Sequence, residues 1–229
     1  MSAPKHLAII PDGNRRWARA RGLEPAEGHR VGFLETSPTV VEAAFAAGVH
    51  TVTHWYFSTE NWGRSDAEVA ALMDLYQQVV REQLPLWQRW GARVCWLGRR
   101  DRVPDGLRDA LLDAEARTAG NTDRVYNIAL DHGGRDSIGR AVRAALAAGV
   151  APEELDGELH RFLDTAGQPH PEPDLILRTS GEQRLSGLLL WQSPYAELCF
   201  VEACFPALTA EEVQAAVAWY AGRARRWGA

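Results

Sequence analysis

The chain has 229 residues, 46% of them hydrophobic, and a formal net charge of −5 at pH 7. A chain of this length can bury about 70% of its surface around one core, so we expect a single domain over residues 1–229. The acidic balance argues against broad binding of nucleic acid, which requires a basic surface, and any anion site must therefore be local.

Apolar periodicity predicts strands that alternate with helices along the chain. The first strand, His6–Ile10, is bounded by Pro11 and Gly13, and a helix follows. Next come a helical segment over 28–48 that Pro38 interrupts, a strand over 50–57, and a long helix that Asp66 caps and Pro85 bends. The remaining predicted elements are a strand over 93–97, a helix over 105–119, a strand over 124–130, a helix after the glycine turn at 131–135, a helical stretch over 152–163, strands over 174–177 and 198–201, and a helix over 209–227.

This alternation predicts an α/β fold with one open, mostly parallel sheet and helices on both faces. Ligands of such sheets bind beyond the carboxyl ends of the strands. Each cluster of polar residues, taken alone, is also explained by ordinary loop polarity. Their common placement after predicted strands favours a site at one sheet edge, formed by residues 12–16, 58–64, 131–136 and 178–186.

The first cluster combines a carboxylate with arginines. Asp12 offers a hard oxygen ligand, Gly13 lets the backbone come close to a ligand, and Arg15 and Arg16 follow at the start of a helix. This arrangement is typical of Mg²⁺ bound to a phosphorylated substrate, because magnesium takes one or two carboxylates and completes its shell with substrate oxygens and water. The alternative is a capping turn before a solvated basic helix.

A second anion site is predicted at Arg178, Arg184 and Ser186, whose planar donors and hydroxyl suit another phosphate or diphosphate. Aromatic residues such as Tyr56 and Tyr76 accompany the clusters, and core packing is the default explanation for them. Arginines and magnesium beside an apolar wall nevertheless suit an amphiphile with an anionic head and a hydrocarbon tail. A prenyl diphosphate is such a molecule.

Cysteine usage and hydropathy bear on the compartment. The cysteines Cys95, Cys199 and Cys204 form no CxxC pair, which indicates neither a disulfide framework nor a structural zinc site and fits a cytoplasmic protein. No apolar run approaches the ~18 residues of a membrane span, and no signal peptide opens the chain. We therefore expect no transmembrane segment, while a peripheral membrane contact stays open.

Five motifs in this order resemble the cis-prenyltransferases, also called Z-isoprenyl diphosphate synthases, the family of undecaprenyl diphosphate synthase. The resemblance extends from His6 to about Trp227 and is closest to the short-chain actinobacterial branch, which includes Z,E-farnesyl diphosphate synthase, especially over 165–198. The motifs are Asp12-Gly13-Asn14-Arg15-Arg16-Trp17, Phe57-Ser58-Thr59-Glu60-Asn61-Trp62 with Arg64, Gly133-Gly134-Arg135, residues 173–182, and Leu190-Trp191-Gln192 through Tyr195-Ala196-Glu197.

The resemblance implies a homodimeric, Mg²⁺-dependent transferase of isoprenoid biosynthesis that condenses isopentenyl diphosphate with an allylic diphosphate and forms a cis double bond. By matching position, Asp12 holds Mg²⁺ and assists departure of the allylic diphosphate, and Glu197 contributes to metal binding. Asn61 matches the position assigned to proton removal. Because an asparagine amide does not take up a proton near neutral pH, a diphosphate oxygen is the alternative acceptor.

The same resemblance implies two sets of substrate contacts. The allylic diphosphate and the reacting carbons would be contacted by Gly13, Asn14, Arg15, Arg16, Trp17, His29, Ser58, Thr59, Glu60, Trp62 and Arg64. Isopentenyl diphosphate would be contacted by Arg178, Arg184, Leu185 and Ser186.

Four sites in the chain depart from the family pattern. Tyr56 stands where long-chain members tend to have a small residue at the entrance of the product tunnel, which predicts a product of ten or fifteen carbons. Pro25 replaces a frequent arginine, Asp131-His132 replaces asparagine and tyrosine, and residues 204–208 replace a tryptophan-bearing stretch. The departures at Pro25 and Asp131-His132 keep an alternative open, namely irregular coupling of allylic units or prenylation of another small acceptor.

Two further alternatives belong to other classes of protein. The chain could be a non-catalytic subunit that supports a partner prenyltransferase, or a binding protein for lipid diphosphates. Asp12, the intact 178–186 segment and Glu197 argue against the subunit, since a scaffold does not need them. Turnover separates the binding protein from the enzyme.

Overall fold

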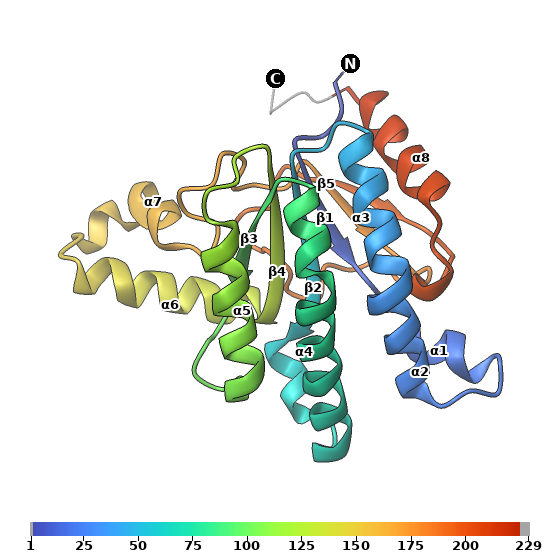
Figure 1. Ribbon diagram of the computed structural model, residues 1–229. Coiled ribbons are helices and arrows are strands. Elements are labelled where there is room, and N and C mark those ends of the chain that lie inside the picture. Colours follow the sequence, from blue (N-terminus) through green and yellow to red (C-terminus); the bar gives the residue numbers. More distant parts are fainter. Residues whose placement is uncertain (1, 225–229) are drawn as a thin grey trace.

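The fold is seen in a computed structural model that describes residues 2–224. Six parallel strands form one open sheet in the order β3-β4-β2-β1-β5-β6 (Figure 1). This confirms the predicted parallel sheet. The strands are β1 (His6–Ile10), β2 (Thr51–Ser58), β3 (Ala92–Leu97), β4 (Arg124–His132), β5 (Leu175–Arg178) and β6 (Glu197–Phe200).

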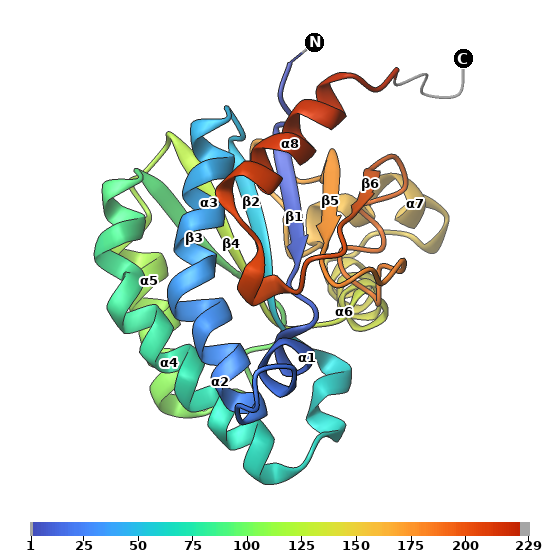
Figure 2. The same ribbon diagram turned by 90° about the vertical axis from the view of Figure 1, so that its right-hand side faces the viewer.

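Helices cover both faces of the sheet, also as predicted. α3, α4, α5 and α8 pack on one face, and α6 and α7 lie on the other side (Figure 2). The helices are α1 (Asn14–Arg19), α2 (Pro25–Arg30), α3 (Ser37–Ala46), α4 (Asp66–Arg89), α5 (Asp105–Thr118), α6 (Gly134–Ala147), α7 (Leu155–Glu158) and α8 (Ala210–Ala221). Shorter helical turns are η1 (Val31–Thr36), η2 (Thr59–Gly63), η3 (Pro152–Glu154), η4 (Leu159–Phe162) and η5 (Phe205–Ala207).

Alternate residues of each strand supply two apolar layers, as the strand repeat of two requires. In β1, Leu7 and Ile9 join the larger core with α3, α4, α5 and α8, while Ala8 and Ile10 face the smaller core. All four side chains are buried, as expected for a parallel strand that is covered on both faces. Leu7 lies opposite Val52 of β2 and Leu175 of β5, so the central strands share one register.

The predicted interruption at Pro38 takes the form of a π-helical turn. α2, η1 and α3 follow one another without a break, and Pro38 lies in the first turn of α3. Because proline has no N–H to donate to the preceding turn, the wider hydrogen-bond spacing of η1 accommodates it.

The long helix α4 begins at Asp66, the residue that was predicted to be its cap. Ser65 has an extended backbone and its side chain accepts the N–H of Glu68, so Ser65 is the N-cap and Asp66 is the first helical residue. The helix passes through Pro85 and continues to Arg89. The predicted cap at Asp66 was therefore wrong by one position, since a residue with helical backbone angles cannot serve as the N-cap.

Other element boundaries also differ from prediction. β4 continues two residues past residue 130, so Asp131 and His132 belong to the strand rather than to the turn after it. The stretch 152–163 consists of the three short pieces η3, α7 and η4. The last helix ends at Ala221 instead of Trp227, and Trp227 itself lies outside the described residues. Within the described residues, no helix is long and apolar enough to cross a membrane.

Candidate active site

Three of the four predicted polar clusters, 12–16, 58–64 and 178–186, line cavities at the carboxyl edge of the sheet, whereas no residue of the fourth, 131–136, lines them. Asp12 follows β1, Ser58 ends β2 and Arg178 ends β5, opposite Ile10. A cavity of about 410 Å³ opens between them and adjoins a second cavity of about 400 Å³. Asp12, Asn14, His29 and Arg64 line both cavities. The edge therefore carries one continuous site of a size that suits a small ligand.

Asp12 occupies the centre of this site. Its carboxylate accepts the N–H of Gly13 at 2.7 Å and Nη2 of Arg178 at 2.7 Å, and its own N–H donates to Thr179 Oγ1 at 2.7 Å. Gly13 has φ +90°, and a Cβ there would lie 2.8 Å from both Cys204 Sγ and Ser180 Cβ. Only glycine fits this turn, which holds the Asp12 carboxylate between the two cavities.

Arginines dominate the second cavity. Glu68 pairs with Arg15 at 3.4 Å and with Arg64 at 2.9 Å. Arg16 donates to the carbonyl of Ser180 at 3.0 Å and pairs with Glu182 at 3.1 Å. With Arg19, these arginines outnumber the carboxylates that they contact, so the cavity attracts anions.

α1 and α2 touch closely enough to bring His29 beside these arginines. A Cβ at Gly28 would lie 2.0 Å from the carbonyl oxygen of Asn14, so this contact depends on glycine. Neither ring nitrogen of His29 has a hydrogen-bond partner within residues 2–224. Burial, and then the charge of Arg64, lower the pKa of His29 to about 4, and the ring is neutral at pH 7. His29 therefore lines the cavity with unused hydrogen-bonding capacity.

Arg178 organises the opposite side of the site. It is almost completely buried, and its Nη1 donates to Ser186 Oγ at 2.8 Å and to the carbonyl of Arg184. Its Nε has no partner among the described residues. Arg184 pairs with Glu182, and this hydrogen bond lowers the pKa of the Glu182 carboxyl. Arg178, Arg184 and Ser186 thus form a second donor surface across Asp12 from the arginine-lined cavity.

The far wall of the first cavity is aromatic. The ring centroid of Phe33 lies 4.8 Å from that of Tyr56 and 5.1 Å from that of Tyr76. Tyr56 is buried, and its hydroxyl lies 3.1 Å from the hydroxyl of Tyr126, whose ring packs 5.3 Å from Trp87. Burial raises the pKa of Tyr56, so the phenol is neutral. These rings form a closed apolar floor beneath the anion site.

Asn61 lines the first cavity from the turn η2, together with Ser58, Glu60 and Arg64. Its Oδ1 accepts the N–H of Ser58 at 3.1 Å in a capping box. Because that hydrogen bond fixes the amide orientation, the remaining polar group of the side chain is the NH₂ donor. The geometry suits Asn61 to hydrogen bonding rather than to proton uptake.

Four of the expected contact residues lie outside the lining of both cavities. Arg21 covers the ring of Trp17 with its guanidinium carbon 4.3 Å from the centroid. The side chain of Thr59 packs against Gly133, and Leu185 packs in the smaller core. Trp62 donates its indole N–H to Asp131. These side chains hold the walls of the site in place.

Glu197 is separated from Asp12 by the length of the sheet. It begins β6 opposite Leu175, at the amino edge, whereas Asp12 follows the carboxyl end of β1. Its carboxylate pairs with Arg223 at 3.0 Å. The structure therefore does not bring Glu197 and Asp12 to one metal ion within this chain, because residues matched by motif can lie at opposite ends of parallel strands.

The donor set fits magnesium held by one protein carboxylate. Among the described residues, no group of three or more histidines, cysteines, aspartates or glutamates could hold a metal ion. Asp12 faces both cavities beside the arginines. Magnesium usually keeps few protein ligands and takes the rest from substrate oxygens and water.

Phe33 and Glu182 contribute to the site although the sequence singled out neither. Phe33 lies within a helical pattern that predicts only core packing, and its contact with Tyr56 depends on how η1 docks on β2. Glu182 bridges Arg16 and Arg184 from opposite sides of the site. Its place beside Arg184 in the 178–186 cluster was the available signal.

Fold and site together define an α/β enzyme whose pocket fits an anionic head and an apolar tail. Residues 10–228 match the family model described as putative undecaprenyl diphosphate synthase. The chain belongs to this family, the cis-prenyltransferases, and is a prenyl-transferring enzyme. The family predicted from the motifs is thereby confirmed.

Relatives cover essentially the whole chain. The isoprenyl transferase of Rhizobium meliloti is 42% identical, and the match covers 99% of this chain and 93% of that protein. The isoprenyl transferase of Aquifex aeolicus is 40% identical, and the match covers 100% of this chain and 97% of that protein. Lavandulyl diphosphate synthase from Lavandula x intermedia, solved in complex with dimethylallyl diphosphate, superposes with a TM-score of 0.94 at 33% identity over 99% of both chains. A probable undecaprenyl diphosphate synthase from Campylobacter jejuni superposes with a TM-score of 0.83 at 28% identity over 100% of both chains.

Proposed function

We propose that this enzyme condenses isopentenyl diphosphate with dimethylallyl or geranyl diphosphate into a Z-configured prenyl diphosphate of ten or fifteen carbons. One observation carries the proposal: Asp12 lies between two donor surfaces, and the cavity beside it ends on a closed aromatic floor. Two diphosphates and one short hydrocarbon tail match this arrangement in charge and polarity.

The allylic diphosphate binds in the arginine-lined cavity in this proposal. Arg15, Arg16 and neutral His29 contact its oxygens, and its tail extends toward Phe33 and Tyr56. When the allylic C–O bond breaks, its electron pair stays on the diphosphate, and the preplaced guanidinium groups stabilise that charge. The aromatic faces flank the allylic cation and keep water away from it.

Asp12 would hold Mg²⁺ against the same diphosphate. The bound ion would neutralise phosphate charge and so make the diphosphate a better leaving group. Asp12 itself keeps Arg178 in place through their 2.7 Å ion pair, which links the two halves of the site.

Isopentenyl diphosphate binds at Arg178, Arg184 and Ser186 in this proposal. Its double bond attacks the allylic C1, and loss of a proton from its C2 restores neutrality and forms the new double bond. Since Oδ1 of Asn61 accepts a backbone N–H, an oxygen of the departing diphosphate is the proposed proton acceptor. Asn61 then donates a hydrogen bond that orients the diphosphate.

Replacing Tyr56 with alanine is expected to lengthen the product by at least one five-carbon unit. Tyr56 closes the floor through its contacts with Phe33 and the Tyr126 hydroxyl, and its removal opens a cavity. Chromatography and mass spectrometry of the dephosphorylated products measure the length. Tyr56→Phe is the matched control, because it keeps the ring and should keep the product. An unchanged length in Tyr56→Ala would contradict this account of the floor.

Irregular coupling of two allylic units is the second candidate. The similarity to lavandulyl diphosphate synthase in complex with dimethylallyl diphosphate favours it, together with Asp131-His132 and Pro25. An enzyme of this kind forms product from dimethylallyl diphosphate alone. A regular synthase does not, because it needs isopentenyl diphosphate.

Product analysis tests the function directly. The purified protein receives Mg²⁺ and isopentenyl diphosphate with dimethylallyl, geranyl or farnesyl diphosphate in turn, and dimethylallyl diphosphate alone in a fourth reaction. A single short Z-product from the first or second primer supports the proposal. Product in the fourth reaction supports irregular coupling. Binding without turnover in every reaction would overturn both in favour of a binding protein or a partner-dependent subunit.

We also propose a cytoplasmic homodimer, as the family resemblance implies. The cysteines Cys95, Cys199 and Cys204 are free thiols, in agreement with a reducing compartment. β6 ends the sheet, and Trp191 and Leu198 expose apolar surface in the same stretch of chain. Sedimentation at several protein concentrations measures the oligomeric state. The proposal also places the enzyme in the short-chain actinobacterial branch of the family, to which its sequence bears the closest resemblance.

A further inference from the structure

Asp131 is a completely buried carboxylate at the end of β4 that lies outside the lining of both cavities. Its φ of 52° is uncommon for a residue other than glycine. A buried charge needs partners, because an unpaired carboxylate is costly to remove from water. The partners of Asp131 therefore reveal what this strand end holds.

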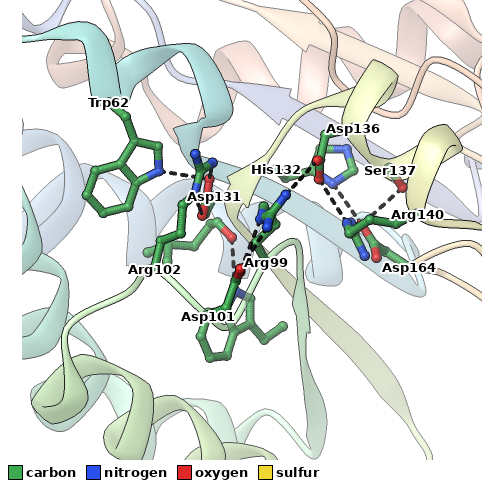
Figure 3. A network of polar contacts seen from close by, with 12 residues as sticks. Trp62, Arg99, Asp101, Arg102, Asp131, His132, Asp136, Ser137, Arg140 and Asp164 are labelled. Carbon is green, nitrogen blue, oxygen red and sulfur yellow. Dashed lines mark hydrogen bonds and ion pairs between the residues drawn. The ribbon is translucent and has the colours of Figure 1, made fainter.

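Two side chains from different segments meet at the Asp131 carboxylate (Figure 3). Trp62 of η2 donates its indole N–H to Oδ1 at 2.9 Å, and Arg102 donates Nε to Oδ2 at 2.8 Å. Arg102 also makes a second, shorter contact to Oδ1, and its guanidinium carbon lies 5.3 Å from the centroid of the Trp62 ring. Asp131 and Arg102 thus hold the indole at its edge and over its face.

The segment that carries Arg102 is itself anchored on the end of β4. The N–H of Arg99 donates to the carbonyl of Asp131 at 3.0 Å. Gly98 has φ +123°, and a Cβ there would lie 2.3 Å from the carbonyl oxygen of Leu130. Because only glycine permits this approach, the position of Arg102 is built into the backbone.

Trp62 directly follows Asn61 in the short turn η2, and its ring packs edge-on against Phe57 at 5.2 Å. If the indole rotated away, Asp131 would lose one of its two partner side chains in a buried environment. That cost fixes the indole. In a single turn, a fixed indole also fixes the backbone that carries Asn61 and Glu60 into the cavity.

We infer that Asp131 is a positioning residue, which acts through the indole N–H of Trp62 to set the placement of the Asn61 amide that orients the departing diphosphate. The inference rests on the proposed function for the role of Asn61. Asp131 touches no substrate in this arrangement. Its effect belongs to kcat rather than to binding of isopentenyl diphosphate, since that diphosphate site lies on the segment after β5.

The remainder of the polar network supplies a matched control. Asp136 pairs with Arg99 at 3.0 Å and with Arg140 at 2.9 Å, and Arg140 pairs with Asp164 at 2.7 Å (Figure 3). Neither Asp136 nor Arg140 contacts Trp62 through a hydrogen bond or ion pair seen within residues 2–224. A substitution at Asp136 therefore disturbs the network without releasing the indole.

The test compares Asp131→Val, Asp131→Asn, Trp62→Phe and Asp136→Val by kcat, by KM for isopentenyl diphosphate and by thermal unfolding. Asp131→Val and Trp62→Phe should each lower kcat roughly 10–100-fold with KM changed less than about threefold, because a small misplacement of a catalytic group has effects of this size. Asp131→Asn should restore kcat to within about threefold of wild type, since its amide oxygen still accepts the indole N–H. Asp136→Val should lower thermal stability while leaving kcat within about twofold.

The double variant Trp62→Phe with Asp131→Val decides whether the two residues act as one unit. The inference expects it to be no slower than either single variant, since both remove the same hydrogen bond. Multiplied losses in kcat would overturn it, as would wild-type kcat in Asp131→Val or an equal loss in Asp136→Val.

A spectroscopic readout separates this inference from the proposed function. In a ¹H–¹⁵N spectrum, the indole resonance absent from Trp62→Phe belongs to Trp62, and it should shift in Asp131→Val but not in Asp136→Val. Trp96→Phe, which removes the indole bond to the carbonyl of Leu130, should leave that resonance in place. If the wild-type protein shows no turnover, the proposed function fails while the spectrum still tests the hydrogen bond from Trp62 to Asp131. An unmoved resonance in Asp131→Val would overturn the inference.

Discussion

Replacing Asp12 with asparagine should lower kcat on the order of a thousandfold, which corresponds to about 4 kcal/mol of lost transition-state stabilisation. The change removes the carboxylate proposed to hold Mg²⁺ and leaves Arg178 without its charged partner. Both losses act where negative charge develops on the departing diphosphate. Steady-state kinetics with a saturating allylic primer and varied Mg²⁺ measure the effect.

Asp113→Asn is the matched control for this prediction. Asp113 lies exposed on α5, where it forms only a 3.4 Å pair with Arg117 one turn away. A surface pair of this kind contributes little to stability, so kcat should stay at the wild-type value. Near-wild-type kcat in Asp12→Asn, with the same dependence on Mg²⁺, would remove Asp12 from the proposed mechanism.

Replacing Arg178 with methionine should raise KM for isopentenyl diphosphate roughly 100-fold or more, with a much smaller change in KM for the allylic primer. Arg178 offers an unused, buried Nε–H and holds Ser186 and the carbonyl of Arg184 through Nη1. Hydrogen bonds to charged groups contribute about 1.5–3 kcal/mol each, and two such losses account for the factor. Initial rates with each substrate varied in turn separate the two KM values.

Two related variants, Arg178→Lys and Arg184→Met, should raise KM for isopentenyl diphosphate less than Arg178→Met does. Arg178→Lys keeps the charge but not the planar fork, so it should recover only part of the loss. Arg184→Met should cost about tenfold, because Arg184 is half-exposed and water competes for its hydrogen bonds. If Arg178→Met instead raised KM for the allylic primer alone, the two diphosphate sites would have to be exchanged.

Site residues next to a strand end were predictable from the sequence. Asp12 and Arg178 each follow an apolar run, and parallel strands present their carboxyl ends at one edge, so their meeting follows from topology alone. Glu197 directly precedes the strand predicted over 198–201 and begins β6, so the same topology places it at the opposite edge of the sheet from Asp12. Motif matching assigns an identity to a position but not the end of the strand at which it lies.

Side-chain direction was beyond the reach of sequence patterns. Trp62 lies in the same short turn as Asn61, yet Asn61 lines the cavity while Trp62 points to Asp131. Phe33 belongs to a helical pattern that predicts a core residue, and it is also part of the cavity floor. The turn η2 and the helix η1 each present neighbouring residues to different surroundings, and only docking against β2 and β4 selects among them.

The sequence by itself determined the family and the parallel α/β architecture, and it predicted the edge of the sheet at which the candidate site lies, because apolar periodicity and turn residues are local properties. Only the tertiary structure decided which side chains reach the cavity, that Arg178 pairs with Asp12, and that Asp131 clamps Trp62. Arg178 and Asp12 are separated by 166 positions in the sequence, and Trp62 and Asp131 by 69. Their geometry follows from strand register and close packing, which no local pattern encodes.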